Sequence, residues 1–503
     1  MVSTQLRAFS RRDRSEHALR CVPWRGRIEG FVCVAAFCCA CDFLLPVRLG
    51  LALAGIAYGC WSLWLGVMES RLTVLRVNPL VTYQLWQTGT LGLSPLYIAL
   101  NYSAEDHVPF GWRFVLPAEI AYGHAILVVG ALALYLGMKQ FQPKEAIRQS
   151  ERGRGCSGWE LWPGFIVGAA LLIFSYEITA TVGSVFAGLS FMSLAVLSLV
   201  AMKPSASLRR SRGVYWAVLL SGTIILLALN ARGDSKMMLS FSFVPLVLAT
   251  LARRRGGLLI AFSIGFAAVY ILVIAPVVAN MRSGVRRDER GMISLLDPDA
   301  SGNVRVQLQS EFRDDPVQYV GSWLDITMRR LGDPVAAGMV SRYVADAGLL
   351  HGAGLDYVPM AFIPRLLWRD KPIVARGRYF TVALGMASAE SSASTSTGQT
   401  AAGELFWNFG WPGVIIGMYL LGAAFSWGWW GADRGDPTNG VFEMTAFIGI
   451  TLSFVLGSGS DAGTGFVGAI GTGIVLRALI RVRDWVFTRQ PRPLGGRCYS
   501  GSQ

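Results

Sequence analysis

The sequence predicts an all-α, polytopic integral membrane protein, with about 12 transmembrane helices and one large, partly helical outer loop. Three observations predict this class: the composition, the recurrence of long apolar runs, and the positions of the cations. Hydrophobic residues make up 53% of the 503-residue chain, and its mean hydropathy is +0.44. Only 16% of residues are charged, against about 25% in a typical soluble domain.

The apolar runs recur from one end of the chain to the other, and each is roughly twenty residues long, enough to cross a bilayer. The bilayer core offers no partner for free backbone groups, so each run is expected to be a helix. The runs lie near 28–46, 49–67, 80–100, 117–138, 159–176, 181–202, 214–230, 237–252, 257–278, 410–431, 441–458 and 463–480.

These runs divide the chain into five regions. The sequence predicts a basic cytoplasmic N-terminus, a nine-helix membrane region, a large outer (periplasmic) loop, a three-helix membrane region and a basic cytoplasmic tail. Their boundaries are 1–27, 28–278, 279–409, 410–480 and 481–503. The first run is long and lacks an Ala-x-Ala cleavage site, so we expect a retained helix rather than a cleaved signal peptide.

The cations assign the two sides of the membrane. The net charge of +14 would also suit nucleic-acid binding, but the cations flank apolar runs, as membrane topology requires. About 28 of the 46 Lys and Arg fall in the segments that an N-terminus-inside arrangement places in the cytoplasm. We therefore expect both termini inside, in a multi-pass protein of a bacterial inner membrane, with no nucleic-acid partner.

The large loop, 279–409, carries helix signals. Asp315 and Pro316 begin one predicted helix that stops at Gly332, and Asp333 with Pro334 begin another that stops at Gly348. A third, short helix is predicted between Pro364 and Pro372, with Arg365 and Arg369 on one face.

Ionisable groups within the apolar runs are few. His124 follows Glu119 by five residues in the fourth run, and such a pair would suit a proton path. The alternative is a hydrogen bond between helices. Asp297 and Asp299 have a spacing that suits a metal, but Asp-Pro is a common turn starter. We expect no metal and no cofactor.

Two basic segments point to a ligand. "FIPRLLWRDKPIVARGRYF", 362–380, is the denser one, and "NARGDSK", 230–236, is a tight turn at the same side of the membrane. The first holds Arg365, Arg369, Lys371, Arg376 and Arg378, and the second holds Arg232 and Lys236. Cations at an outer membrane surface favour an anionic, amphiphilic ligand, and guanidinium groups bind phosphate oxygens bidentately. A lipid-linked diphosphate fits. The alternatives are contact with anionic phospholipid headgroups, snorkelling, or an Arg232–Asp234 ion pair.

A family resemblance rests on these same residues. "IPRLLWRDKP", then "GRYF" and "GELFWNFGWPGVIIGMYLLG", together with the Arg232-Gly233 turn, resemble the O-antigen polymerase (Wzy-type) and oligosaccharide repeat-unit polymerase families. The resemblance covers roughly 214–431. It implies a glycosyltransferase that joins undecaprenyl-diphosphate-linked oligosaccharide units into O-antigen, capsule or exopolysaccharide. It also implies membrane lipids, a flippase and a chain-length regulator as partners.

The resemblance assigns roles by position. Arg232 and Arg365 would hold the departing diphosphate, and either His351 or Glu404 would act as the base for the acceptor hydroxyl. The supporting cations would be Lys236, Arg329, Arg330, Arg369, Lys371, Arg376 and Arg378.

Two rival functions stay open at this point. An O-antigen ligase would share the architecture and the arginines. A polysaccharide transporter or flippase would need more polar residues deep in its helices and paired half-repeats.

Overall fold

The computed structural model describes most of the chain between residues 24 and 482. The described ranges are 24–72, 79–110, 113–140, 158–173, 191–205, 208, 210–230, 236–252, 265, 268–277, 310–361, 363, 367–368, 370, 376–385, 398–432 and short stretches between 441 and 482. All statements below concern these residues.

The described chain is almost entirely helical. The N-terminal elements are α2 (Trp24–Leu44), α3 (Val47–Leu72), α4 (Pro79–Gln87), the π-helix η1 (Thr88–Leu93), α5 (Ser94–Asn101) and α6 (Pro117–Gln140). Between α5 and α6, β1 (Val108–Phe110) and β2 (Arg113–Val115) form an antiparallel hairpin in which Val108 pairs with Val115.

The remaining elements follow in chain order. They are α7 (Gly158–Ile173), α9 (Met192–Met202), α11 (Arg212–Asn230), α12 (Lys236–Phe241), α13 (Val244–Ala252), the π-helix η4 (Tyr270–Ile274), α17 (Pro316–Arg330), α18 (Asp333–Ala347), the 3-10 helix η5 (Ala353–Leu355), α19 (Tyr357–Ala361), α20 (Arg376–Ala383) and α21 (Ala401–Ala432).

Four described helices are long and apolar enough to cross a membrane. They are Val47–Glu69, Pro117–Gln140, Arg212–Asn230 and Ala401–Trp427. The first three coincide with predicted runs. The fourth begins at Ala401, nine residues before the predicted run 410–431, so the predicted loop boundary at 409 differs from the structure, and the helix is broken at Gly410. The all-α class is confirmed and a multi-pass membrane protein is supported. The predicted total of about 12 spans stays a prediction. Three shorter apolar helices, Leu161–Ile173, Met192–Met202 and Leu239–Thr250, lie in three other predicted runs.

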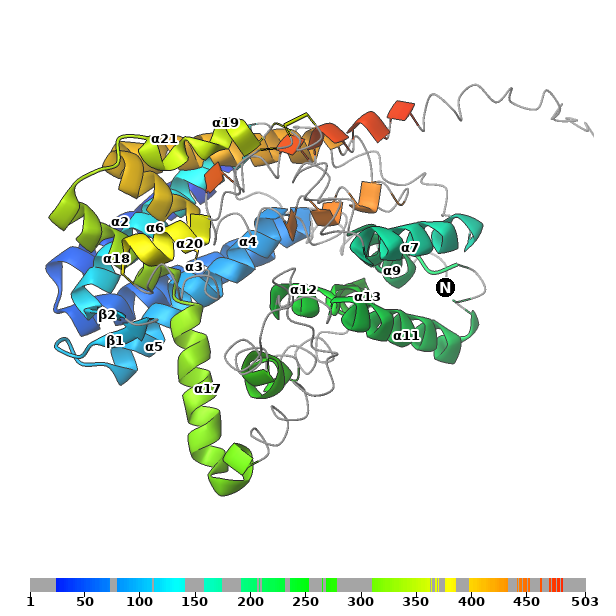
Figure 1. The fold of residues 1–503 in the computed structure, drawn as a ribbon, viewed down its shortest axis with the longest axis horizontal. Helices are drawn as coiled ribbons and strands as arrows, with labels where there is room; N and C mark the ends of the chain where they lie inside the picture. Colours follow the sequence, from blue (N-terminus) through cyan, green and yellow to red (C-terminus); the bar gives the residue numbers. More distant parts are fainter. Residues whose placement is uncertain are drawn as a thin grey trace, which may run out of the picture.

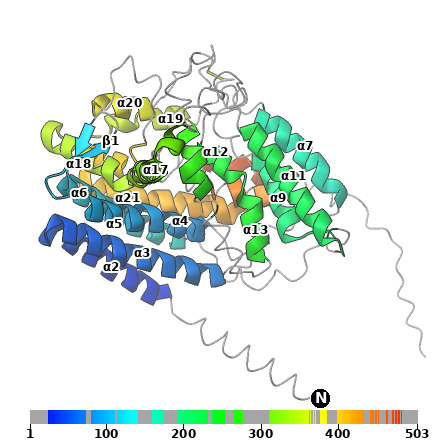
Figure 2. The same cartoon turned by 90° about the horizontal axis from the view of Figure 1, so that it is seen from below.

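The helices form two groups (Figures 1 and 2). The first contains α2 to α6, α18 and α21, and α6 is the most buried of the four long apolar helices. The second contains α7, α9, α11 and α13, which pack against one another.

Contacts between side chains fix the relative directions of the first helices. Glu69, near the end of α3, pairs with Lys139 at the end of α6, and Tyr58 packs on His124 nearer the start of both. Helices α3 and α6 are therefore parallel. Asp42, at the end of α2, bonds to His124, so α2 runs antiparallel to α6. This alternation is what consecutive membrane crossings require.

Helices α6 and α21 pack through small residues. A Cβ added to Gly130 would lie 2.9 Å from Cβ of Ala402, and one added to Gly137 would clash with the carbonyl of Tyr419. Small residues let helix backbones approach closely, which is the usual way that helices associate within a membrane. Helix α21 is broken at Gly410, whose φ of 64° and ψ of −152° are not helical. After this break, Val414 and Met418 lie at Gly130 and Tyr419 lies at Gly137, so this part of α21 is parallel to α6 although the two are far apart in sequence.

The two helices predicted by caps in the large loop are present. The Asp315 carboxylate accepts a hydrogen bond from the Gln318 backbone N–H at 2.9 Å and caps α17. Helix α18 ends at Gly348, whose φ is +83°. One detail differs from the prediction, because the N-cap of α18 is Gly332 and Asp333 is already the first helical residue.

The environment of α18 was not foreseen. Its residues 334–340 are all buried, and Gly338 lies against the backbone of Glu119 in α6. The amphipathic pattern predicts one apolar face. In the structure, residues 334–340 of α18 are instead enclosed between α6 and α21. The large loop therefore contributes a helix to the core of the first group.

The short helix predicted between Pro364 and Pro372 is wrong at its described positions. Leu367 and Asp370 lie in turns, and Trp368 has no regular structure. Only seven residues separate the two prolines, fewer than two helical turns, and a helix that short does not repay its nucleation cost. The rest of this segment lies outside the described residues.

Candidate functional site

The predicted site residue that the structure describes most fully is Glu404, in the first turn of α21. Its side chain is buried and accepts hydrogen bonds on both oxygens. Gln399 Nε2 donates to Oε1 at 2.6 Å, and the backbone N–H of Ala462 donates to Oε2 at 2.8 Å. The hydroxyl of Tyr357 lies 3.4 Å from Oε1 and 3.3 Å from Oε2. One carboxylate thus joins the start of α21 to Tyr357 in α19 and to the segment around Ala462.

The local sequence explains how Glu404 is placed. Thr400 has a positive φ of 63°, which is uncommon for a residue other than glycine. Its hydroxyl accepts a hydrogen bond from the Gly403 N–H at 3.0 Å, and its carbonyl accepts one from the Glu404 N–H at 2.9 Å. Thr400 therefore starts α21 and sets the direction in which Glu404 points.

The next turn of α21 holds the segment that contains His351. The Leu350 N–H donates to the Trp407 carbonyl at 3.0 Å, and the Gly354 N–H donates to Asn408 Oδ1 at 2.9 Å. His351 lies between them, with a φ of 50° and an exposed side chain. The two predicted bases are thus on adjoining segments, one exposed and one buried.

An aromatic cluster attaches α20 to the same turn of α21. The Trp407 ring is fully buried and stacks with Tyr379 at a centroid distance of 6.0 Å. Phe380 and Tyr343 pack edge-on against it, at 5.8 and 5.1 Å. Because Tyr379 and Phe380 belong to α20, this helix lies beside Trp407. Helix α20 also carries Arg376 and Arg378.

Arg329 is already bonded within the protein. Its Nη2 lies 2.7 Å from Asp325 Oδ2, and its Nη1 donates to the Pro109 carbonyl at 2.8 Å. The hydroxyls of Tyr97 and Tyr102 donate to the other oxygen of Asp325, at 3.2 and 2.9 Å. These contacts fasten α17 to α5 and the hairpin, which favours a structural role for Arg329.

The other predicted site residues cannot be placed as side chains. Arg232, Arg365, Arg369 and Lys371 lie outside the described residues. For Lys236, Arg330, Arg376 and Arg378 only the helix is described: α12 begins at Lys236, α17 ends at Arg330, and α20 holds the other two. Their roles stay predictions.

His124 does not pair with Glu119. Its Nδ1 lies 2.7 Å from Asp42 Oδ2, and its Nε2 lies 3.0 Å from the Leu91 carbonyl in the π-helix η1. Five residues along a helix correspond to a rotation of about 140° away from the starting face, so Glu119 and His124 point in different directions. Glu119 instead accepts from the Leu116 N–H and faces Arg342 at 3.5 Å. The hydrogen bond between helices, with Asp42 as partner, is what the structure contains.

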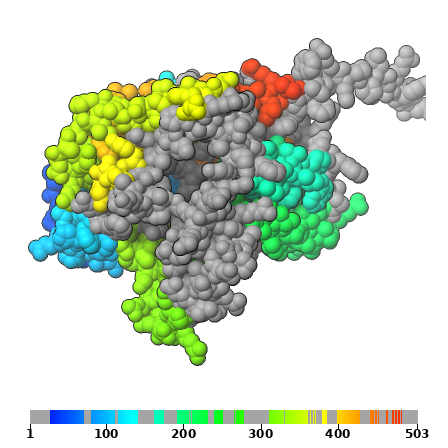
Figure 3. Space-filling model, in the orientation of Figure 1, coloured from blue at the N-terminus to red at the C-terminus, as the bar shows by residue number. Residues whose placement is uncertain are grey.

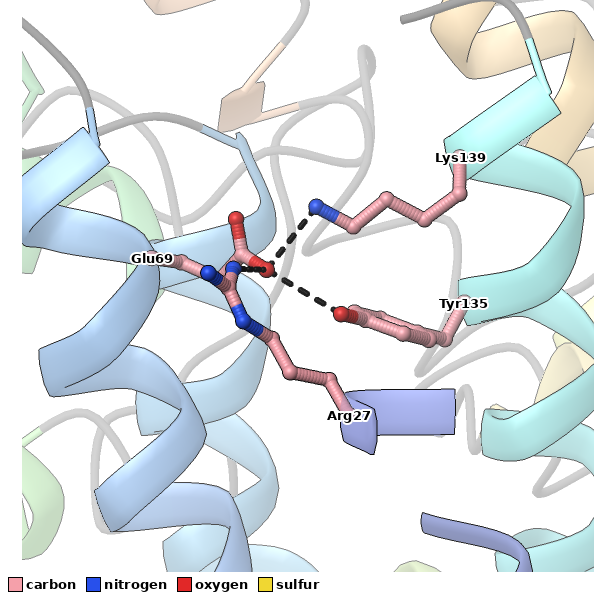
Figure 4. Close-up of polar contacts among 4 residues, drawn as sticks. All are labelled: Arg27, Glu69, Tyr135 and Lys139. Atoms are coloured by element: carbon pink, nitrogen blue, oxygen red, sulfur yellow. Dashed lines mark hydrogen bonds and ion pairs between the residues drawn. The ribbon is translucent and has the colours of Figure 1, made fainter. Parts of the chain in front are cut away.

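A second buried ionic cluster joins α2, α3 and α6 at the opposite ends of these helices (Figure 4). Glu69 Oε1 accepts from Arg27 Nη1 at 3.0 Å, from Lys139 Nζ at 2.8 Å and from the Tyr135 hydroxyl at 3.0 Å. Nothing in the sequence spacing predicts that these four residues meet. The cluster lies where the predicted topology has its cytoplasmic side, and it fixes three helices to one another.

Sequence reasoning also missed the partners of Glu404. Thr400, Glu404 and Asn408 recur every four residues at the start of an apolar run, so they share one helix face. That polar stripe was the available signal. Tyr357, Gln399 and Ala462 carried none, because their contacts with Glu404 depend on the tertiary fold.

Comparison with protein families, with curated proteins and with solved structures finds no match for this chain. Its function is therefore inferred from its own residues and their arrangement.

Proposed function

We propose that this protein is a glycosyltransferase that joins undecaprenyl-diphosphate-linked oligosaccharide units into a surface polysaccharide at the outer face of the inner membrane. One observation carries the proposal. The cation-bearing helix α20 packs through Tyr379 onto Trp407, one turn beyond the buried Glu404. Residues of α19, α20 and the start of α21, all within the predicted loop 279–409, therefore lie together, and this supports the proposal.

The proposed reaction breaks the bond between the anomeric carbon of the growing chain and its lipid diphosphate. A hydroxyl on the next lipid-linked unit forms the new glycosidic bond and gives up its proton to a base. Negative charge develops on the departing diphosphate, and arginines placed there stabilise it. Arg232 and Arg365 are proposed for this role, with Arg376, Arg378 and the other cations of the segment beside them.

The base is proposed from the difference between His351 and Glu404. The exposed His351 ring is the group that an acceptor hydroxyl can reach. Glu404 is enclosed and already accepts N–H donors on both oxygens, so we assign it the positioning of α19 and of the segment around Ala462.

The helix directions support the proposed twelve-span arrangement. Because α6 and the part of α21 after Gly410 are parallel, an odd number of crossings must separate them. The predicted runs between them number five: 159–176, 181–202, 214–230, 237–252 and 257–278. In the proposed arrangement the large loop and the 101–116 connection then share one side, which the positive-inside rule assigns to the outer face. Reporter fusions at Ser310 and Ser207 should therefore report opposite sides.

The proposal is tested at the arginines. Arg232→Ala and Arg365→Ala should abolish polymer formation in cells while the protein still inserts in the membrane. Arg→Lys at either position should restore little activity, because lysine lacks the planar fork that binds two phosphate oxygens. Arg209→Ala, on the predicted cytoplasmic side, is the matched control and should be nearly silent. Full activity in both alanine variants would place the diphosphate elsewhere and contradict the proposal.

A further inference from the structure

Helix α17 has an apolar stripe that the protein itself does not cover. Val317, Val320 and Leu324 are 83%, 38% and 37% exposed, and their spacing of three and four residues puts them on one face. Tyr319 and Trp323, on the neighbouring face, are buried. The polar Gln318 and Ser322 point another way and are exposed. The helix therefore has a buried aromatic face, an exposed apolar face and an exposed polar face.

Two hydrogen-bonded contacts show at which depth along the predicted spans α17 lies. The Tyr319 hydroxyl donates to the Leu272 carbonyl at 3.1 Å. Leu272 lies six residues before the end of the predicted span 257–278, which is about 9 Å along a helix. At the other end of α17, Asp325 accepts from Tyr97 and Tyr102, where the predicted span 80–100 finishes. Both contacts place α17 near the outer ends of two spans.

The orientation agrees with this level. In Figure 1 α17 runs across the direction of α4, α6 and α21, and Figure 2 looks nearly along its axis. Figure 3 shows its far end projecting from the rest of the described chain. A helix that lies at the outer ends of spans and runs across them lies along the membrane surface.

The spans that α17 crosses expose apolar side chains themselves. Leu93 and Leu100 are exposed on η1 and α5, and Val269 and Val273 are exposed on and beside η4. Side chains of this kind on spanning helices face lipid. The apolar stripe of α17 is thus next to surfaces that lipid already covers, rather than in the interior of the bundle.

We infer that α17 is an interfacial helix, with Val317, Val320 and Leu324 in the boundary between headgroups and acyl chains of the outer leaflet. An amphipathic helix in this position buries its apolar face about 5–10 Å deep. Tyr319 and Trp323 are residue types that favour the same boundary. The inference rests on the proposed membrane arrangement and not on the proposed chemistry. Its consequence is that the large loop is held at headgroup level, where a lipid-linked diphosphate lies.

The test measures the surroundings of single positions in the full-length protein, reconstituted in phosphatidylethanolamine–phosphatidylglycerol vesicles. A spin label is attached to a genetically encoded keto amino acid at Val317, Val320, Leu324 or Ser322, which leaves the eight native cysteines in place. Collision with oxygen reports lipid, and collision with a soluble nickel chelate reports water. Position 322 on the polar face is the matched control.

The inference expects the nickel accessibility at 317, 320 and 324 to be about fivefold lower than at 322, with oxygen accessibility higher. Nickel accessibility at 317 equal to that at 322 would show that the stripe faces water and would overturn the inference. Low accessibility to both reagents would show a protein partner instead, and would overturn it equally. A variant that fails to insert at one position leaves the other two stripe positions to decide. Loss of polymerase activity in the arginine variants has no bearing on this readout, so the two proposals fail separately.

Discussion

Glu404 accepts more hydrogen bonds than an amide side chain in its place could. Its two oxygens receive N–H donors from Gln399 and from the backbone of Ala462, with the Tyr357 hydroxyl between them. A carboxylate has acceptor sites on both oxygens, whereas a glutamine has only one oxygen and presents N–H groups on the other side. An amide at position 404 would therefore weaken the contacts with Tyr357, Gln399 and Ala462.

Glu404→Gln should destabilise the protein by about 1–3 kcal/mol, because one buried donor loses its acceptor. We expect a lower midpoint of thermal unfolding in detergent, followed by fluorescence. Polymer formation should fall with it, since Tyr357 of α19 and the segment around Ala462 lose their common anchor.

The matched control is Asp356→Asn, which changes an exposed carboxylate next to Tyr357. It should shift the unfolding midpoint by no more than the measurement error. A Glu404→Gln variant with unchanged thermal stability and no activity would contradict the positioning role, and would favour Glu404 as the base.

At the scale of elements, small residues decide how closely α6 can approach α21 and α18. Gly137 lies against the Tyr419 carbonyl and Gly123 against the backbone of Pro334 and Gly338. No side chain fits at either position while these backbones keep their separation. The apolar runs predict the helices, but which glycines meet a neighbouring backbone depends on the rotation of each helix, which composition does not specify.

Gly137→Ala should destabilise the protein by about 1–3 kcal/mol, the usual cost of overpacking a close contact. Gly213→Ala in α11 is the control, because nothing lies within 4 Å of an added Cβ there. That change should be neutral or stabilising by up to about 1 kcal/mol, since alanine favours helix. Thermal unfolding of the two variants in the same detergent separates the effects. Equal midpoints would show that the α6–α21 contact is looser than described.

Burial at the start of α18 makes stability depend on pH. It raises the pKa of the Asp333 carboxyl from 3.8 to about 7. The unfolded chain therefore loses this proton at lower pH than the folded chain, so stability falls as pH rises from about 4 through 7 and is then level. The effect has the opposite sign to that of an ion-paired carboxylate.

Asp333→Asn removes this titration. The variant should be more stable than the parent at pH 8, and the difference should shrink towards zero near pH 4. Asp346→Asn, at an exposed position on the same helix, is the control and should leave the pH dependence due to Asp333 in place. A stabilisation by Asp333→Asn that is equal at both pH values would contradict the titration and would indicate a helix-propensity effect instead.

For the whole molecule, capping residues and apolar runs predicted individual helices, but they did not predict which distant segments contact one another. The capping residues Asp315 and Gly348 predicted α17 and α18 correctly, because a helix cap involves only residues within one or two turns of the helix end. The burial of α18, the Asp42–His124 bond and the Glu69 cluster depend on how α2, α3, α6 and α18 assemble. Of the Glu404 site the sequence predicted only Glu404 itself, because its partners Tyr357 and Ala462 are distant in the chain.

The last prediction concerns the whole pathway and follows from the side on which the cations are proposed to lie. An outward-facing basic cluster can act only on a lipid-linked donor that has already crossed the membrane, because nucleotide sugars stay inside. Deleting the gene should leave synthesis and flipping of the repeat unit intact. Single units should then accumulate on their lipid carrier, or appear one unit long on the final acceptor, and long polymer should vanish.

Mass analysis of the carrier-linked saccharides, combined with their sidedness, separates this outcome from the two rival functions. A missing ligase would leave long chains stranded on the lipid carrier, because polymerisation would continue without transfer. A missing flippase would leave single units facing the cytoplasm, where an impermeant probe cannot reach them. Restoring the gene with Arg209→Ala should restore long polymer, whereas restoring it with Arg365→Ala should not. Stranded long chains in the deletion strain would reject the polymerase in favour of the ligase, since both would use the same outward-facing arginines on the same lipid diphosphate.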